Sequence, residues 1–204
     1  MRRLLDLAEA QIAELLRKAA EIATGALDVA AECFGGVCQP ERARAAASEV
    51  RRIHEHIAEL ALEAIARYSP VAVDLRYLRG AMFASYDLYR VARYGYDVAD
   101  IASRLGSGCS SEKVREISRV VRRMVAESVE MLLSHRSDKL DEIVRLDDEI
   151  VDKSYMDSVA RLMERREKCD VVEAMALRLL ERASDHAVYI ARQANFVATG
   201  ELYL

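Results

Sequence analysis

The chain has 204 residues, of which 52% are hydrophobic and 31% are charged, and this composition excludes an intrinsically disordered protein. Eight glycines and two prolines are too few for the many turns of a β-sandwich or a loop-rich α/β chain. The chain has 30 Lys and Arg and 34 Asp and Glu, which gives a net charge of −4. The two signs are mixed along the chain, so the sequence shows no basic cluster of the kind that binds nucleic acid.

Three helices are predicted in the first half of the chain. The first spans about residues 2–32, where apolar side chains recur with the 3.6-residue helical period. Pro40 suits the first turn of the second helix. That helix closes at Ser69-Pro70, because the residue before a proline is pushed out of the α region. The third helix spans about residues 71–105.

The second half repeats this scheme after a linker rich in glycine and serine at 106–111. Three further helices are predicted at about 111–135, 137–164 and 169–199. The short connections require neighbouring helices to be antiparallel. Asp6 and Glu9 interrupt any signal-peptide core after the two N-terminal arginines, and no uncharged apolar run approaches the roughly 18 to 20 residues of a bilayer span. We therefore expect a cytoplasmic protein without membrane insertion.

The third helices of the two halves resemble each other. Residues 88–99 match residues 180–191 at a constant offset of 92, with identical Leu, Arg and Ala positions. Shared amphipathic patterning alone would produce part of this match. Together with the equal helix counts, it predicts an all-α fold of two tandem three-helix bundles, with six long antiparallel helices divided between residues 1–105 and 106–204.

The four cysteines do not form an obvious framework. Cys33 and Cys38 lie five positions apart across a predicted turn, and Cys109 and Cys169 are remote from them and from each other. We expect incidental thiols. A local disulfide between Cys33 and Cys38 and a metal site are the alternatives, although zinc requires about four ligands and disulfides inside cells are typical mainly of hyperthermophiles.

Pairs of acidic residues on the last two helices are candidate metal ligands. Glu181 and Asp185 are four positions apart, as are Asp148 and Asp152 on the preceding helix, so each pair shares one helix face. Carboxylates are ligands for hard cations, and two such helices packed together resemble the sites of di-iron bundles. A solvated acidic surface is the alternative interpretation.

The first half lacks the equivalent acids. Tyr89 and Arg93 occupy the positions of Glu181 and Asp185, and Arg93 is placed to pair with Asp97 four residues later. His54 and His56 are two apart and cannot easily face one ion, so surface imidazoles are expected.

No constellation in the sequence indicates catalysis. There is no glycine-rich phosphate loop, no GxSxG and no HExxH. His186 beside Asp185 is a poor acid–base pair, because adjacent side chains on a helix diverge. We expect a protein that is not an enzyme.

Three segments resemble the PhoU family of phosphate-transport regulators. Residues 69–76, SPVAVDLR, resemble the family pattern Q-P-V-A-x-D-L-R, and residues 87–92, DLYRVA, resemble D-L-E-R-I-G. Residues 180–191, LERASDHAVYIA, resemble L-E-R-I-G-D-H-A-V-N-I-A. The resemblance covers both halves of the chain and implies two similar three-helix bundles.

This resemblance implies a regulator that restrains a phosphate ABC importer and its phosphate signalling pathway. The implied partners are transporter components and a phosphate-sensing kinase, and a homodimer is compatible with duplicated bundles. The family's E/D-x-x-x-D motif binds iron or other metal clusters in some members. It is kept here at Glu181 and Asp185 and lost at Tyr89 and Arg93. The alternative function is a carboxylate-bridged iron-binding bundle of the storage or oxidase type.

Overall fold

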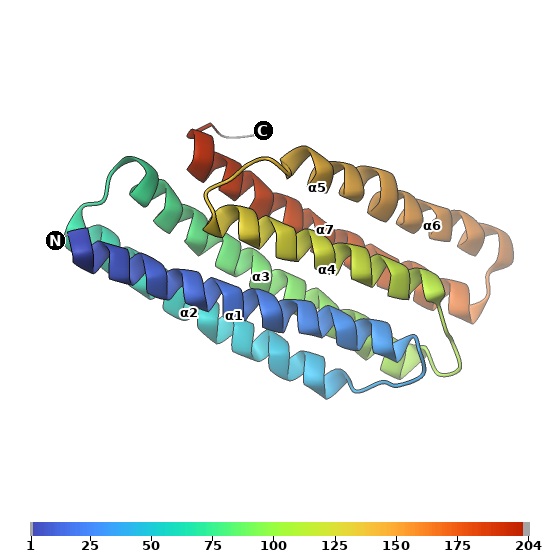
Figure 1. Cartoon of the computed structure of the whole chain (residues 1–204). Coiled ribbons are helices and arrows are strands. Elements are labelled where there is room, and N and C mark those ends of the chain that lie inside the picture. Colours follow the sequence, from blue (N-terminus) through green and yellow to red (C-terminus); the bar gives the residue numbers. More distant parts are fainter. Residues whose placement is uncertain (1, 202–204) are drawn as a thin grey trace.

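The computed structural model describes residues 2–201, which form helices and short connections without any strand in that range (Figure 1). The helices are α1 (Arg2–Cys33), α2 (Pro40–Tyr68), α3 (Ala72–Leu105), α4 (Glu112–Leu133), α5 (Leu140–Leu146), the π-helical turn η1 (Asp147–Asp152), α6 (Lys153–Arg165) and α7 (Lys168–Thr199). The predicted all-α fold is confirmed. The predicted domain limits at residues 1 and 202–204 lie outside the described residues.

The helix predicted at 137–164 contains a feature that periodicity did not reveal. α5, η1 and α6 follow one another without a break, and the flanking residues Leu146 and Lys153 keep helical dihedral angles. η1 is therefore a single π-helical turn inside a longer helix. Such turns are rare and occur frequently at functional sites. This turn carries Asp147, Asp148 and Asp152.

The helices form two bundles that pack side by side. α1, α2 and α3 contact one another, and α7 contacts α4 and the α5–η1–α6 helix. The two bundles meet through α3 against α7 and α1 against α4 (Figure 1). Gly95 on α3 permits a close approach to α1, because a Cβ there would lie 2.8 Å from the carbonyl carbon of Ala26. Aliphatic side chains fill both cores, as expected for a chain without Trp.

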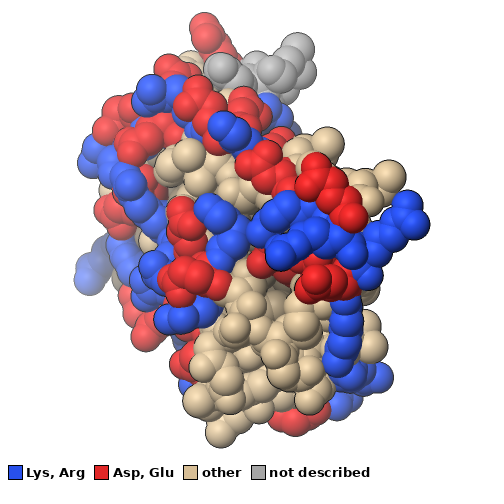
Figure 2. All heavy atoms as spheres, turned by 90° about the vertical axis from the view of Figure 1, so that its right-hand side faces the viewer, with Lys and Arg blue, Asp and Glu red and all other residues tan. Residues whose placement is uncertain are grey.

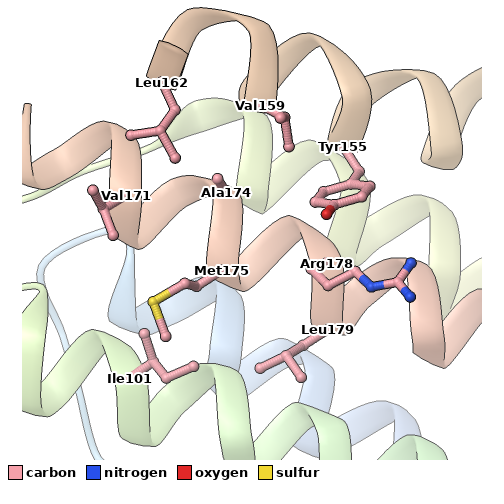
Figure 3. Close-up of a pocket in the computed structure, with 9 residues that line it drawn as sticks. All are labelled: Ile101, Tyr155, Val159, Leu162, Val171, Ala174, Met175, Arg178 and Leu179. Atoms are coloured by element: carbon pink, nitrogen blue, oxygen red, sulfur yellow. The ribbon is translucent and has the colours of Figure 1, made fainter. Parts of the chain in front are cut away.

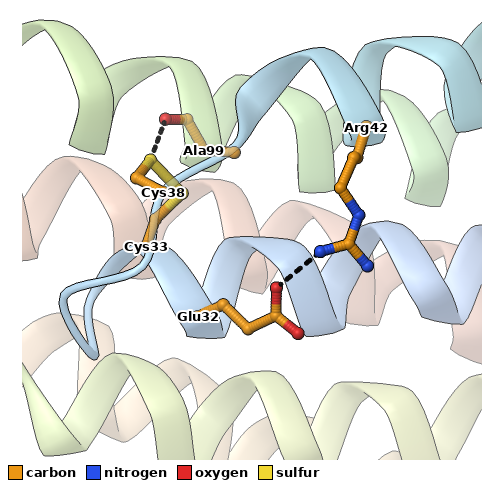
Figure 4. Close-up of a disulfide and its surroundings, with 5 residues drawn as sticks. All are labelled: Glu32, Cys33, Cys38, Arg42 and Ala99. Carbon is orange, nitrogen blue, oxygen red and sulfur yellow. Dashed lines mark hydrogen bonds and ion pairs between the residues drawn. A yellow bond between two sulfur atoms is a disulfide. The ribbon is translucent and has the colours of Figure 1, made fainter.

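Two disulfides close one end of the molecule, so the expectation of incidental free thiols is wrong. Cys33 pairs with Cys38 across the turn between α1 and α2 (Figure 4), and Cys109 pairs with Cys169 at the start of α7. Sequence spacing could not predict the second pair, because the fold brings together residues 60 positions apart. The connections at 34–39 and 106–111 carry no charged residue, and Figure 2 shows an uncharged area on this end.

No helix within the described part of the chain combines the length and the low charge that a bilayer span requires.

Candidate functional site

The structure brings the predicted acidic residues together between η1 and α7. Asp148 and Asp152 lie on the π-helical turn, which contacts the α7 helix that carries Glu181 and Asp185. The negative charges of Asp185 and Asp148 act on Asp152, and those of Asp185 and Asp152 act on Glu181. The four residues therefore form one electrostatic cluster, although Asp148 is exposed.

Burial and mutual repulsion raise the pKa values in this cluster. Burial is the main cause of the raised pKa of Asp152 and of Glu181, and neighbouring acids add to it. Asp147, on the same π-helical turn, is only 8% exposed. Burial, with the nearby charges of Asp152 and Asp185, raises the pKa of Asp147 to about 7. The sequence analysis did not select Asp147.

Two arginines on α7 form ion pairs with Glu181 and Asp185, which are two of the predicted metal ligands. Arg178 donates to Glu181 Oε1, and Arg182 Nη1 lies 2.9 Å from Asp185 Oδ2. Glu181 Oε2 and Asp147 Oδ1 are buried and accept no hydrogen bond. Within residues 2–201, no three Asp, Glu, His or Cys side chains are placed to share an ion. Carboxylate oxygens are the donors that hard cations prefer, but in this arrangement Arg178 and Arg182 are the positive partners of Glu181 and Asp185.

The first bundle carries the opposite charge at the corresponding place. Arg93 forms the predicted ion pair with Asp97, at 2.8 Å and 3.1 Å. Tyr89 is half-buried against the core and contacts the ring of Tyr86 at a centroid distance of 6.3 Å. His54 is not a surface imidazole as expected: it is half-buried, and its Nδ1 lies 2.9 Å from Ser85 Oγ.

A buried polar pair links the two bundles. His186 Nδ1 on α7 lies 2.8 Å from Asp87 Oδ1 on α3, and both side chains are largely shielded from water. Burial raises the pKa of Asp87, and the hydrogen bond to His186 partly offsets this effect. His186 thus points toward the other bundle, and it forms a polar contact across the interface between the halves.

An apolar groove of about 370 Å³ lies at the side of α7 that faces α6 (Figure 3). Leu162 and Val159 of α6 project toward Val171 and Met175 of α7, and Ile101 of α3 forms the opposite wall. Arg178 is the charged residue among those that line the groove. The sequence analysis did not identify this surface.

The duplicated bundles and their paired helix faces define a tandem helical-repeat protein. A family model described as the PhoU domain matches residues 12–102 and again residues 114–194. The chain belongs to the PhoU family, and the resemblance seen in the sequence is confirmed.

Related proteins agree with this assignment. The chain is 30% identical over 161 residues to "Phosphate-specific transport system accessory protein PhoU homolog" of Synechocystis, covering 75% of this chain and 71% of that protein. It is 34% identical over 170 residues to PhoU homolog 2 of Mycobacterium tuberculosis, covering 76% and 79%.

Two crystal structures share the fold. One is the phosphate transport system regulatory protein PhoU from Streptococcus pneumoniae, with a TM-score of 0.86 and 19% identity, covering 98% of this chain and 99% of that one. The other is PhoU from Pseudomonas aeruginosa, with a TM-score of 0.76 and 25% identity, covering 98% and 97%.

Proposed function

We propose that this chain is an accessory protein of phosphate uptake that works in the cytoplasm by binding other proteins and without catalysing a reaction. The observation that carries the proposal is the family match in both bundles, joined to relatives that are named for phosphate-specific transport. We infer that its partners are components of a phosphate ABC importer and a phosphate-sensing kinase, both of which the family resemblance implies. A homodimer stays a prediction.

The groove between α6 and α7 supports a binding role. Its lining residues Val171 and Met175 are each 40% exposed, and an exposed apolar surface with a charged residue at its edge is typical of protein interfaces. We propose that a component of the importer docks here, because a partner of matching apolar surface would bury these side chains and pair with Arg178.

A pull-down with the importer ATPase tests this function. The purified chain is expected to retain the ATPase at micromolar concentration. Met175→Glu places a charge in the groove and is expected to weaken retention at least tenfold, while Met163→Glu, which changes an exposed methionine outside the groove, is the matched control. If the unmodified chain retains no transporter component, the proposed function is wrong; if both variants bind normally, the groove is not the docking surface.

We also propose that the acidic cluster binds a hard cation, iron or another divalent or trivalent metal, in the second bundle. The specific observation is the gathering of acids between the π-helical turn and α7, where burial first, and then the charges of neighbouring acids, raise the pKa of Glu181 and of Asp152. Glu181, Asp185, Asp148 and Asp152 would hold the ion, which would neutralise their mutual repulsion.

Elemental analysis of the purified chain tests this second proposal. Metal content is expected to fall in Glu181→Ala and to stay unchanged in Glu164→Ala, an exposed acid on α6 outside the cluster. Equal metal content in the two variants would contradict the site. About two iron ions per chain with an oxygen-dependent absorbance would instead favour the iron-binding bundle over the regulator.

A further inference from the structure

A second small pocket opens between α2 and α3 in the first bundle. Its volume is about 150 Å³, and no Asp or Glu is among the residues that line it. α2 contributes Arg44, Ser48 and Arg51, and α3 contributes Tyr89, Arg93 and Tyr96. The pocket therefore gathers three guanidinium groups and three hydroxyl groups at one place on the surface.

Helical spacing explains why these side chains converge. Arg44 and Arg51 are seven residues apart, two turns along one face of α2, and Tyr89 and Arg93 are four apart on α3. Ala47 lies between the α2 residues and is buried, so its small side chain leaves room between the longer ones. The regular spacing of residues on the facing sides of α2 and α3 therefore accounts for the pocket.

The arginines keep donors available for a ligand. Arg93 uses its Nε and one terminal nitrogen on Asp97, and Arg51 Nε lies 3.0 Å from Glu55 Oε1. Arg44 is 3.5 Å from Glu41. Each guanidinium has five N–H donors, and exposed ion pairs of this kind contribute little to stability. Each arginine has donors beyond those that its acidic neighbour accepts.

We propose that this pocket binds a phosphate-type oxyanion, either free or as the terminal phosphate of a small molecule. The planar fork of arginine matches a phosphate edge with two parallel hydrogen bonds, and the hydroxyls of Tyr89 and Tyr96 can donate to the remaining oxygens, whereas the Ser48 hydroxyl donates to the Arg44 carbonyl oxygen. The volume holds several waters and hence a small oxyanion.

The repeat shows how the charge at this place differs between the two bundles. The two PhoU-domain matches end at 102 and 194, an offset of 92 that places Tyr89 opposite Glu181 and Arg93 opposite Asp185. The corresponding positions of the third helix are thus acidic in the second bundle and carry a tyrosine and an arginine in the first.

Titration calorimetry at constant ionic strength tests the proposal with inorganic phosphate, pyrophosphate and chloride as the probes. We expect saturable binding of one phosphate-bearing anion per chain and no saturable binding of chloride, and a repeat of the titration at a higher fixed ionic strength is expected to show weaker binding. If inorganic phosphate binds as tightly as pyrophosphate, the source is the free ion. If only pyrophosphate saturates, the site reads a phosphate attached to a larger group. Both results support the oxyanion site.

Three variants make the test specific. Arg93→Gln is expected to weaken binding at least tenfold, while Asp97→Asn is expected to tighten it, because the donors now held by Asp97 become free. Arg104→Gln is the matched control, because Arg104 lies on α3, pairs with Asp100 four residues away and is outside the pocket. Circular dichroism verifies that each variant is folded.

The proposal is overturned if no phosphate-bearing anion binds saturably, or if Arg93→Gln and Arg104→Gln bind equally well. The measurement uses the purified chain without any transporter, so its result does not depend on the proposed function. The role of anion binding in regulation does rest on the proposed function: a regulator of phosphate uptake with this pocket would respond to phosphate directly.

Discussion

The close contact between α1 and α3 predicts that alanine is tolerated differently at two glycines. A Cβ at Gly95 would lie 2.8 Å from the carbonyl carbon of Ala26 and 2.9 Å from its oxygen, so Gly95→Ala forces α1 and α3 apart. A Cβ at Gly25 would meet nothing within 4 Å. Both changes gain about 1 kcal/mol of helix propensity. Overpacking of a core contact costs about 1–3 kcal/mol, and only Gly95→Ala incurs it.

Urea denaturation followed by circular dichroism measures the two free energies of unfolding. Gly25→Ala is expected to be about 1 kcal/mol more stable than the original chain. Gly95→Ala is expected to lie about 1–3 kcal/mol below Gly25→Ala, a difference that isolates the packing cost because the propensity gain is common to both. This corresponds to roughly 2–12 °C in Tm for a chain of this size. Equal stabilisation by both changes would refute the close approach of the helices.

Two further predictions concern stability. Replacing Cys109 and Cys169 by serine is expected to lower the free energy of unfolding by about 4 kcal/mol, and replacing Cys33 and Cys38 by about 2 kcal/mol, because the first bridge closes a much longer loop; equal losses in urea titrations would contradict this explanation. Asp147 has a folded pKa of about 7, above the ordinary 3.8. The stability that its protonated side chain contributes to the folded state is therefore fully present below about pH 4 and is lost as the pH rises through 7. Asp147→Asn, measured with a chelator present, is therefore expected to raise the free energy of unfolding at pH 8 by up to about 4 kcal/mol, reduced by the screening of nearby water. At pH 4 it is expected to leave the free energy of unfolding unchanged. A gain in stability that does not depend on pH would count against the raised pKa.

Much of the fold followed from the sequence because long helices leave strong periodic signals. The predicted limits of the third helix, 71–105, differ from α3 by one residue at one end, and the linker at 106–111 lies where α3 and α4 are separated. The π-helical turn at Asp147–Asp152 was not predictable, since one extra residue in a turn barely disturbs a 3.6-residue pattern. The bridge between Cys109 and Cys169 required tertiary structure.

The missed polar residues share one detectable signal. His186 lies three residues after Ala183 and four before Ile190, both fully buried, and Asp147 lies four residues from Ile143 and from Val151, which are also fully buried. A polar residue on the apolar face of a helix is buried, and burial shifts its pKa or requires a partner. The structure places the two acidic pairs close together, but the ion pairs made by Arg178 and Arg182 on the same helix depend on side-chain geometry that spacing does not specify.

Phosphate uptake by cells tests the central claim most directly. Cells of the source organism that lack this chain, grown with plentiful phosphate, are expected to take up labelled phosphate faster than the parent, because the importer is no longer restrained. Restoring the chain should return uptake to the parental rate. Identical uptake with and without the chain, at both high and low phosphate, would contradict its role as a regulator of phosphate transport.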